Sequence, residues 1–244
     1  MFSQLFVSHV SLNDDLPKDS WLAKLPVVKS LQSRGGLEFD TPVTFFMGEN
    51  GAGKSTLIEA IAVSLGFNPE GGTVNFNFST NDSHSPLHRY ITVSKGVKRH
   101  RDGYFLRAES FYNAASFIQQ LQSDPTFLAY GDKSLHDMSH GESFLTLVET
   151  RFSKNGLYIL DEPEAALSPT GIMRLMVTID RLSKEGAQFI ISTHSPILTA
   201  LPGAAVYQIN SEGIGRVNWN ETEHFVLTKQ FLNDPDRMLK YLLD

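Results

Sequence analysis

Eight residues near the start of the chain have the types and the spacing needed to bind phosphate. Residues 48–55 read GENGAGKS, which matches the pattern GxxxxGK followed by Ser or Thr. Glycine lets a backbone curl around phosphate oxygens without a Cβ in the way, and the curled N–H groups attract an anion. Lys54 adds a positive charge for the β- and γ-phosphates, and the Ser55 hydroxyl is a ligand for Mg²⁺. The expected nucleotide contacts are Gly48, Asn50, Gly51, Gly53, Lys54, Ser55 and Thr56.

The elements around this loop are those that the motif requires. Residues 43–47 form a short apolar run that is typical of a buried strand. After the loop, Leu57, Ile58 and Ile61 recur at helical spacing, and Gly66 is a candidate for the end of that helix. The alternative is a chance glycine-rich turn. The order of strand, loop and helix argues against this alternative.

A second apolar run ends in two carboxylates. Residues 157–160 read LYIL and are followed by Asp161 and Glu162. Asp161 is a candidate ligand of Mg²⁺, and Glu162 is a candidate general base that polarises the attacking water. The alternative is an exposed pair of acids at the end of a strand. The phosphate-binding loop upstream favours the catalytic interpretation.

Two further stretches place polar residues beside expected secondary structure. Ser139 lies in the sequence MSHGE just before an expected helix, where a hydroxyl and a backbone N–H suit an anion. The alternative for Ser139 is a simple capping turn with Glu142. His194 follows an apolar strand at residues 188–192. A lone histidine is more often structural or exposed, but this one follows the strand next in order after the two carboxylates.

Taken in this order, the motifs resemble those of the ABC ATPase superfamily. The resemblance implies that Ser139 and Gly141 bind the γ-phosphate of an ATP held by the opposite subunit of a head-to-tail homodimer. It also implies that His194 is the switch histidine that touches the γ-phosphate and the attacking water. The signature departs from the usual Leu-Ser-Gly-Gly-Gln, because His140 replaces a glycine and Glu142 replaces the glutamine.

The resemblance assigns three further positions. Glu109 stands where the superfamily has the glutamine of the Q-loop, and a carboxylate there can coordinate Mg²⁺ or orient water. A simple acid at the end of a strand is the alternative for Glu109. Residues 165–168 occupy the position of the D-loop, which crosses the dimer interface. The adenine is expected to stack on an N-terminal side chain, and the candidates are Phe6, Trp21 and Phe39.

Other residues narrow the resemblance to a subgroup. Residues 161–164 read DEPE, which resembles the ending common in RecF, OLD and related ATPases that are not transporters. Transporter subunits more often have threonine where Glu164 stands. The blocks at residues 66–72, 105–111 and 221–224 look like a bacterial family of short stand-alone ATPases, labelled only as AAA-family or ABC-like.

The expected fold class is α/β, with a P-loop NTPase core of the ABC-ATPase type. Its mainly parallel sheet is flanked by helices and accompanied by a small antiparallel β subdomain and a short helical insertion. We expect one domain over residues 1–244, with the helical insertion that carries the signature at about residues 110–152. Strands are predicted at residues 4–11, within residues 37–47 and ending in residues 43–47, and at residues 89–93, 103–108, 156–160 and 188–192. Helices are predicted after residue 55 and at residues 110–123, 141–152 and 169–184, with two short helices from residue 221 that break at residues 234–235.

Composition limits the classes of function. The net charge of −6 provides no overall attraction to DNA or to anionic lipid. The chain has no cysteine, which excludes disulfides and thiolate metal sites and is typical of a reducing cytoplasm. No stretch has the roughly 20 apolar residues that span a bilayer. We therefore expect a cytoplasmic ATPase that uses ATP and Mg²⁺ and does not insert into a membrane.

Three interpretations of the ATP cycle remain open. The first is an ATPase that acts on nucleic acid, in repair or in defence, and the second is the nucleotide-binding subunit of a transporter. The third is a switch that binds a protein partner only in its ATP-bound state. The first is favoured by Glu164 and by a basic cluster that could contact DNA phosphates, although a solvated hairpin tip is an alternative for this cluster. The basic cluster is Lys95, Lys98, Arg99, His100 and Arg101.

Overall fold

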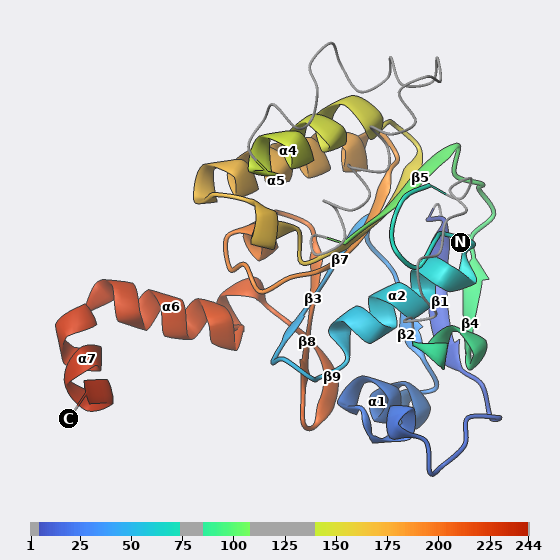
Figure 1. Cartoon of the computed structure of the whole chain (residues 1–244), viewed down its shortest axis with the longest axis horizontal. Coiled ribbons are helices and arrows are strands. Elements are labelled where there is room, and N and C mark those ends of the chain that lie inside the picture. Colours follow the sequence, from blue (N-terminus) through green and yellow to red (C-terminus); the bar gives the residue numbers. More distant parts are fainter. Residues whose placement is uncertain (1–4, 74–84, 108–139, 244) are drawn as a thin grey trace.

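Two β-sheets with helices around them build the molecule (Figure 1). This computed structural model describes residues 5–73, 85–107 and 140–243. The larger sheet has six strands in the order β5-β6-β7-β3-β8-β9, and the smaller sheet has three in the order β2-β1-β4. The α/β class, the mainly parallel sheet and the small antiparallel sheet are all as predicted.

The larger sheet is parallel except at one edge. Strands β3, β5, β6, β7 and β8 run in the same direction, and only β9 is antiparallel to its neighbour β8. The carboxyl ends of the parallel strands therefore meet at one edge, where α/β proteins bind ligands. The strands are β3 (Val43–Gly48), β5 (Asp102–Arg107), β6 (Gly156–Asp161), β7 (Gln188–Ser192), β8 (Ala205–Asn210) and β9 (Gly213–Val217).

Side chains along the buried strands point alternately to the two faces of this sheet, and a hydrophobic core lies on each face. In β6, Leu157 and Ile159 pack into one core, whereas Tyr158 and Leu160 pack into the other. A strand buried on both faces reads as a continuous apolar run, because neither face needs polar side chains. This explains why β3, β6 and β7 were the strands that the sequence marked most clearly.

Different helices cover the two faces (Figure 1). One core includes side chains of α1 (Pro26–Arg34), α2 (Lys54–Ser64) and the smaller sheet. The other includes side chains of α4 (His140–Arg151) and α5 (Pro169–Lys184), which lie next to each other. The phosphate-binding segment thus leaves the central strand β3 and enters α2 on the first of these faces.

The smaller sheet is joined to the larger one by a buried glutamine. Its strands are β1 (Val7–Leu12), β2 (Leu37–Glu38) and β4 (Ile91–Lys95), all antiparallel. Gln188, at the start of β7, accepts hydrogen bonds from the N–H groups of Phe6 and Val7 at 2.8 and 2.9 Å. Its amide also donates to the Val7 carbonyl at 2.9 Å. These bonds fix β1 against the central sheet.

The hairpin interpretation of the basic cluster is wrong. Strand β4 pairs with β1, whereas β5 pairs in parallel with β6, so the segment between β4 and β5 crosses from one sheet to the other. His100 is not free on this segment, because its ring packs edge-on against Phe6 and stacks on Phe67. The four Lys and Arg residues of the cluster are exposed.

The chain ends in two helices that project from the body (Figure 1). They are α6 (Glu223–Asn233) and α7 (Pro235–Leu243), separated at Asp234 as predicted. We call residues 223–243 the C-terminal arm. None of its residues is buried. Its exposed large apolar side chains are Val226, Leu227, Phe231, Leu232, Leu239, Tyr241, Leu242 and Leu243.

Most predicted elements are present within about three residues of the predicted ends, but residues 37–47 contain two strands, β2 and β3, which belong to different sheets. Helix α1 and strands β8 and β9 were not predicted, and the helix predicted at residues 110–123 lies outside the described residues. Short 3-10 helices complete the fold: η1 (Trp21–Lys24), η2 (Pro86–Arg89), η5 (Pro163–Ala166), η6 (Leu198–Ala200) and η7 (Trp219–Glu221). Within the described part of the chain, no helix has the length and apolar character needed to cross a membrane.

Candidate nucleotide-binding site

Three glycines of the phosphate-binding loop have backbones that only glycine adopts easily. The φ angles of Gly48, Gly51 and Gly53 are 144°, 82° and 95°. A Cβ on Gly48 would lie 2.0 Å from the carbonyl oxygen of Ile209 in β8, and one on Gly53 would lie 2.5 Å from Val27 Cγ1 in α1. The loop therefore depends on glycine both for its curl and for its close approach to β8 and α1.

The space around a Cβ differs between Gly48 and Gly51, and the first prediction uses this difference. We expect Gly48→Ala to lower the free energy of unfolding by at least about 2 kcal/mol, because the methyl group meets a backbone carbonyl at a strained φ. Gly51→Ala is the matched control, since nothing lies within 4 Å of its Cβ position. Its cost is the left-handed backbone alone, about 1 kcal/mol. Urea unfolding measures both, and equal destabilisation would contradict this account of the loop.

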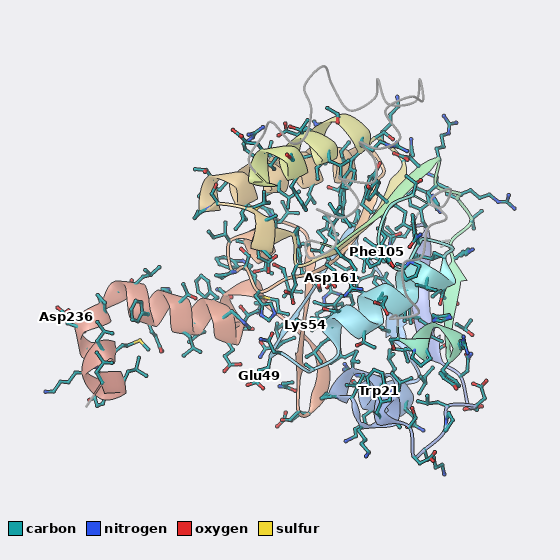
Figure 2. The ribbon with its side chains drawn as sticks, in the orientation of Figure 1. Trp21, Glu49, Lys54, Phe105, Asp161 and Asp236 are labelled. Atoms are coloured by element: carbon teal, nitrogen blue, oxygen red, sulfur yellow. The ribbon has the colours of Figure 1, made fainter. Side chains whose placement is uncertain are left out.

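Lys54 is held at the start of α2 by the loop itself. Its side chain is 4% exposed, and Nζ donates to the carbonyls of Gly48 and Glu49 at 2.8 and 2.9 Å. Burial lowers the pKa of Lys54, while the nearby charges of Glu162, Asp161 and Glu164 act in the opposite direction. Figure 2 shows Lys54 and Asp161 in the same region of the molecule. A cation fixed among carboxylates suits a polyphosphate that arrives with a divalent metal.

Asp161 ends β6 and is buried, with a hydrogen-bond donor on one side and a cation on the other. The Ser192 hydroxyl at the end of β7 donates to Oδ1. Arg107 at the end of β5 places Nε 3.6 Å from Oδ2. The same guanidinium donates to Glu59 of α2 at 2.6 Å. Neither Arg107, Glu59 nor Ser192 was identified from the sequence, since each is an ordinary residue until the parallel strands bring it to Asp161.

Glu162 follows Asp161 with an unusual backbone. Its φ and ψ are 50° and 52°, a left-handed conformation that is rare outside glycine and is often found at functional sites. The Glu162 N–H donates to the Ser192 carbonyl at 3.1 Å, which holds this turn against β7. The carboxylate Oε1 lies 3.2 Å from Nε2 of His194. The predicted general base and the predicted switch histidine are therefore in contact.

His194 is oriented through both its backbone and its ring. Its N–H donates to the Glu164 carboxylate, and the partly exposed ring lies against Glu162. Burial lowers the pKa of His194, and the charge of Lys54 lowers it further. Burial also raises the pKa of Glu164. Glu164, which the sequence marked only as a sign of a subgroup, has a direct structural role in placing His194.

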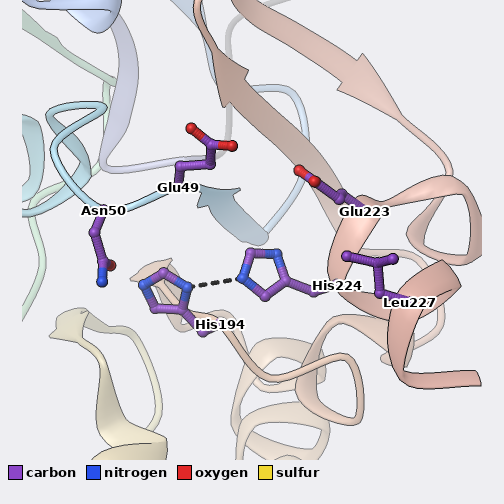
Figure 3. A pocket seen from close by; sticks show the side chains of 6 residues that line it. All are labelled: Glu49, Asn50, His194, Glu223, His224 and Leu227. Carbon is purple, nitrogen blue, oxygen red and sulfur yellow. Dashed lines mark hydrogen bonds between the residues drawn. The ribbon is translucent and has the colours of Figure 1, made fainter. Parts of the chain in front are cut away.

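A small cavity lies beside these groups, and its lining includes His224, to which the sequence analysis assigned no role. Its volume is about 220 Å³. Nδ1 of His194 lies 3.0 Å from Nε2 of His224, the second residue of α6 (Figure 3). His224 belongs to the block at residues 221–224 that carried the family resemblance, but no role followed from it. The residues that line the cavity are Glu49, Asn50, His194, Glu223, His224 and Leu227.

Not every predicted site residue can be placed. Ser139 and Glu109 lie outside the described residues. Gly141, in the first turn of α4, approaches the segment after β6, because a Cβ there would lie 2.8 Å from the carbonyl oxygen of Ala166. The signature helix thus starts against the segment that was predicted to be the D-loop. Ser55 and Thr56 are half-buried in the first turn of α2.

Two of the three candidates for adenine stacking are wrong. Phe6 and Phe39 are each 4% exposed and belong to the hydrophobic core, so neither presents a free ring face. Trp21, in η1, is 54% exposed. It precedes α1, whose Val27 N–H donates to the Ala52 carbonyl of the phosphate-binding loop. Trp21 is therefore the candidate that the structure leaves available (Figure 2).

Comparison with known proteins finds similarity to ATP-binding proteins, as the geometry of the site leads us to expect. A family model described as "AAA domain" matches residues 28–143. The arabinose import ATP-binding protein AraG of Pseudomonas savastanoi pv. phaseolicola is 30% identical over 214 residues, which cover 78% of this chain and 41% of that protein. The ribose import ATP-binding protein RbsA of Bacillus cereus is 24% identical over 168 residues, 61% of this chain and 33% of that protein. The chain spans less than half the length of these curated relatives.

Solved structures share the fold. The structure of cbiO1 from Clostridium perfringens, described as part of the ABC transporter complex cbiONQ, has a TM-score of 0.51 at 18% identity. The match covers 98% of this chain and all of that one. A nucleotide-free ATP-binding cassette from an ABC transporter has a TM-score of 0.50 at 16% identity, over 95% of this chain and 96% of that one. The chain is thus similar to ATP-binding proteins in sequence and to ATP-binding cassettes in fold, and its phosphate-binding loop has the motif of P-loop ATPases.

Proposed function

We propose that the chain binds ATP at the carboxyl ends of β3, β6 and β7 and hydrolyses it to ADP and phosphate. One observation carries this proposal: Glu162 and His194 are in contact at 3.2 Å, next to a buried Lys54 that the phosphate-binding loop holds in place. Positioning and charge stabilisation supply most of the catalysis in phosphoryl transfer. A preorganised cation, a carboxylate and an imidazole at one edge of a sheet provide both.

Each of these three side chains has a distinct task. Lys54 binds the β- and γ-phosphates and balances charge that develops on the transferred group. The Glu162 carboxylate accepts a hydrogen bond from the attacking water and draws off its proton. His194 directs a ring N–H toward the same place, where it holds the γ-phosphate and the water in line. Catalysis therefore requires all three groups to keep their mutual geometry.

The oxygen ligands beside Lys54 fit Mg²⁺. Ser55 and Asp161 offer a hydroxyl and a carboxylate, and Mg²⁺ is usually bound by one or two such groups together with phosphate oxygens and water. Among the described residues no group of three His, Asp or Glu side chains forms a complete metal cage, so the phosphates would supply the remaining ligands. Bound Mg²⁺ would neutralise charge on the phosphates, while Ser192 and Arg107 orient Asp161. Glu109 stays a predicted further ligand.

We also propose that the complete site forms between two copies of the chain. Of the two predicted γ-phosphate ligands, Gly141 lies at the start of α4, where an added Cβ would meet the Ala166 carbonyl of the predicted D-loop. In a head-to-tail dimer, this helix start would face the ATP of the other copy. ATP would then bind the closed dimer better than the open one, and hydrolysis would release it.

The process driven by this cycle is proposed to involve nucleic acid, because basic side chains are exposed at the end of β4 and on the crossing segment between β4 and β5. These are Lys95 at the end of β4 and Lys98, Arg99 and Arg101 on the crossing segment. We expect double- or single-stranded DNA to raise the ATPase rate several-fold in a salt-sensitive way. The triple variant Lys98→Ala, Arg99→Ala, Arg101→Ala should lose this stimulation and keep the basal rate. Its matched control neutralises three exposed lysines elsewhere, Lys18, Lys24 and Lys29. Equal stimulation in both triple variants would refute the role of the crossing segment.

The second candidate is a nucleotide-binding subunit of an importer. Its support is the similarity to the curated relatives, which are named as arabinose and ribose import ATP-binding proteins. Such a subunit would associate with a membrane protein and show no response to DNA. Indifference of the ATPase rate to DNA, combined with co-purification of a membrane protein, would favour this candidate. A soluble partner captured only in the ATP-bound state would favour a protein switch.

A further inference from the structure

The link between His194 and His224 joins the site to the C-terminal arm. Nδ1 of His194 and Nε2 of His224 are 3.0 Å apart, and their ring centroids are 5.0 Å apart with an interplanar angle of 60° (Figure 3). His224 therefore meets the ring nitrogen of His194 that does not face Glu162. The predicted motifs assign no role to His224.

The neighbours of the two ring nitrogens of His194 favour one arrangement of its proton. A carboxylate can only accept, so the 3.2 Å contact with Glu162 favours a proton on Nε2 of His194. A neutral imidazole has one N–H, which leaves Nδ1 of His194 as an acceptor. His224 must then donate from its Nε2. The lowered pKa of His194 is consistent with the neutral ring in this arrangement.

His224 lies between a buried residue, Thr222, which we call the root of the C-terminal arm, and the exposed part of that arm. Thr222, the N-cap residue of α6, is fully buried, and its hydroxyl donates to the Trp219 carbonyl at 2.8 Å. Beyond Thr222, none of residues 223–243 is buried. His224 lies two residues from the root, at the junction where a displacement of the arm would move it.

We propose that His224 is a positioning residue that holds His194 in its Nε2–H tautomer and that the C-terminal arm thereby sets the rate of ATP hydrolysis. The proposal rests on the proposed function of His194. With His224 in place, the N–H of His194 points toward Glu162 and the space for the γ-phosphate. When His224 is absent or withdrawn, the ring can rotate or take the other tautomer, and Nε2 no longer presents a proton.

Kinetics of full-length variants test this role. We expect His224→Ala to lower kcat by roughly 10- to 100-fold, the usual cost of losing an outer partner of a functional histidine. The KM for ATP should stay unchanged, because Lys54 and the loop still bind the phosphates. His224→Gln should restore most of kcat, because its amide keeps an N–H donor at a similar reach. Val226→Ala, on the same helix, is the control and should resemble wild type.

A double-mutant cycle separates positioning through His194 from a general effect on the fold. In the His194→Ala background, His224→Ala should cause no further loss of kcat, because its target is already gone. Full additivity of the two losses would overturn the proposal. An unchanged kcat in His224→Ala, with active wild type, would overturn it as well while leaving the ATPase assignment intact.

NMR of the histidine imidazoles provides a readout that does not depend on ATPase activity. The nitrogen shifts of His194, assigned by comparison with His194→Ala, should report the Nε2–H tautomer in wild type and a mixture of tautomers in His224→Ala. The same tautomer in both proteins would overturn the proposal. If wild type hydrolyses no ATP, the proposed function fails, and the NMR result still decides whether His224 orients His194.

Discussion

Replacing Glu162 by glutamine is expected to lower kcat for ATP hydrolysis by roughly 10²- to 10⁴-fold, the usual contribution of a general base. The amide keeps the shape of the side chain and its hydrogen-bonding oxygen but does not accept the proton of the attacking water. ATP binding should persist, because Lys54 and the loop are untouched. Phosphate release measures the loss, and equilibrium dialysis with labelled ATP measures the binding.

The variant also tests the proposed assembly. If hydrolysis is what releases the dimer, Glu162→Gln with ATP and Mg²⁺ should have twice the mass of the single chain in light scattering, and with ADP it should be a monomer. Glu212→Gln, an exposed glutamate on the turn before β9, is the matched control and should behave as wild type. A monomer under saturating ATP would refute the head-to-tail arrangement, and normal hydrolysis would refute the role of Glu162.

The second large effect is expected from Lys54→Met. Loss of a buried, hydrogen-bonded charge from its partner typically costs about 2–5 kcal/mol, which weakens ATP binding by roughly 30- to 5,000-fold. The free energy of unfolding without nucleotide should rise or stay unchanged. The lowered pKa of Lys54 shows that burial disfavours its charge, and an apolar side chain of similar length avoids that cost.

The two measurements for Lys54→Met are isothermal titration with ATP and thermal unfolding without nucleotide. Lys24→Met, at the exposed end of η1, is the control and should change neither. A large fall in unfolding temperature for Lys54→Met would indicate that the loop depends on the ammonium for folding. Unchanged ATP affinity would show that Lys54 does not bind the phosphates.

Elements that are marked by consecutive residues could be predicted from the sequence. The apolar strand, the glycine-rich loop and the helix around Lys54 are contiguous, and so is the run that ends in Asp161 and Glu162. Burial on both faces makes such strands conspicuous, and their parallel order then brings Glu162 and His194 to one edge of the sheet. The sequence therefore predicted that Glu162 and His194 lie near each other, although it did not give their contact.

Contacts between residues far apart in the chain had no such signal. Arg107 joins Asp161 to Glu59 across three elements, and His224 lies 30 residues beyond His194. The partner of β4 could not be read locally either, since an alternating strand followed by a basic turn resembles a hairpin whichever sheet it enters. The edge strand β9, with glycines at Gly213 and Gly215, lacks the continuous apolar run that marks a central strand.

Steady-state phosphate release by the purified wild-type chain, with Glu162→Gln prepared in the same way as the background, tests the central claim most directly. We predict hydrolysis that requires Mg²⁺, stops when the metal is chelated and is at least about a hundredfold faster in wild type than in the variant. Equal rates in the two preparations, or no hydrolysis by wild type at saturating ATP and Mg²⁺, would contradict the assignment of an ATPase site to Lys54, Glu162 and His194.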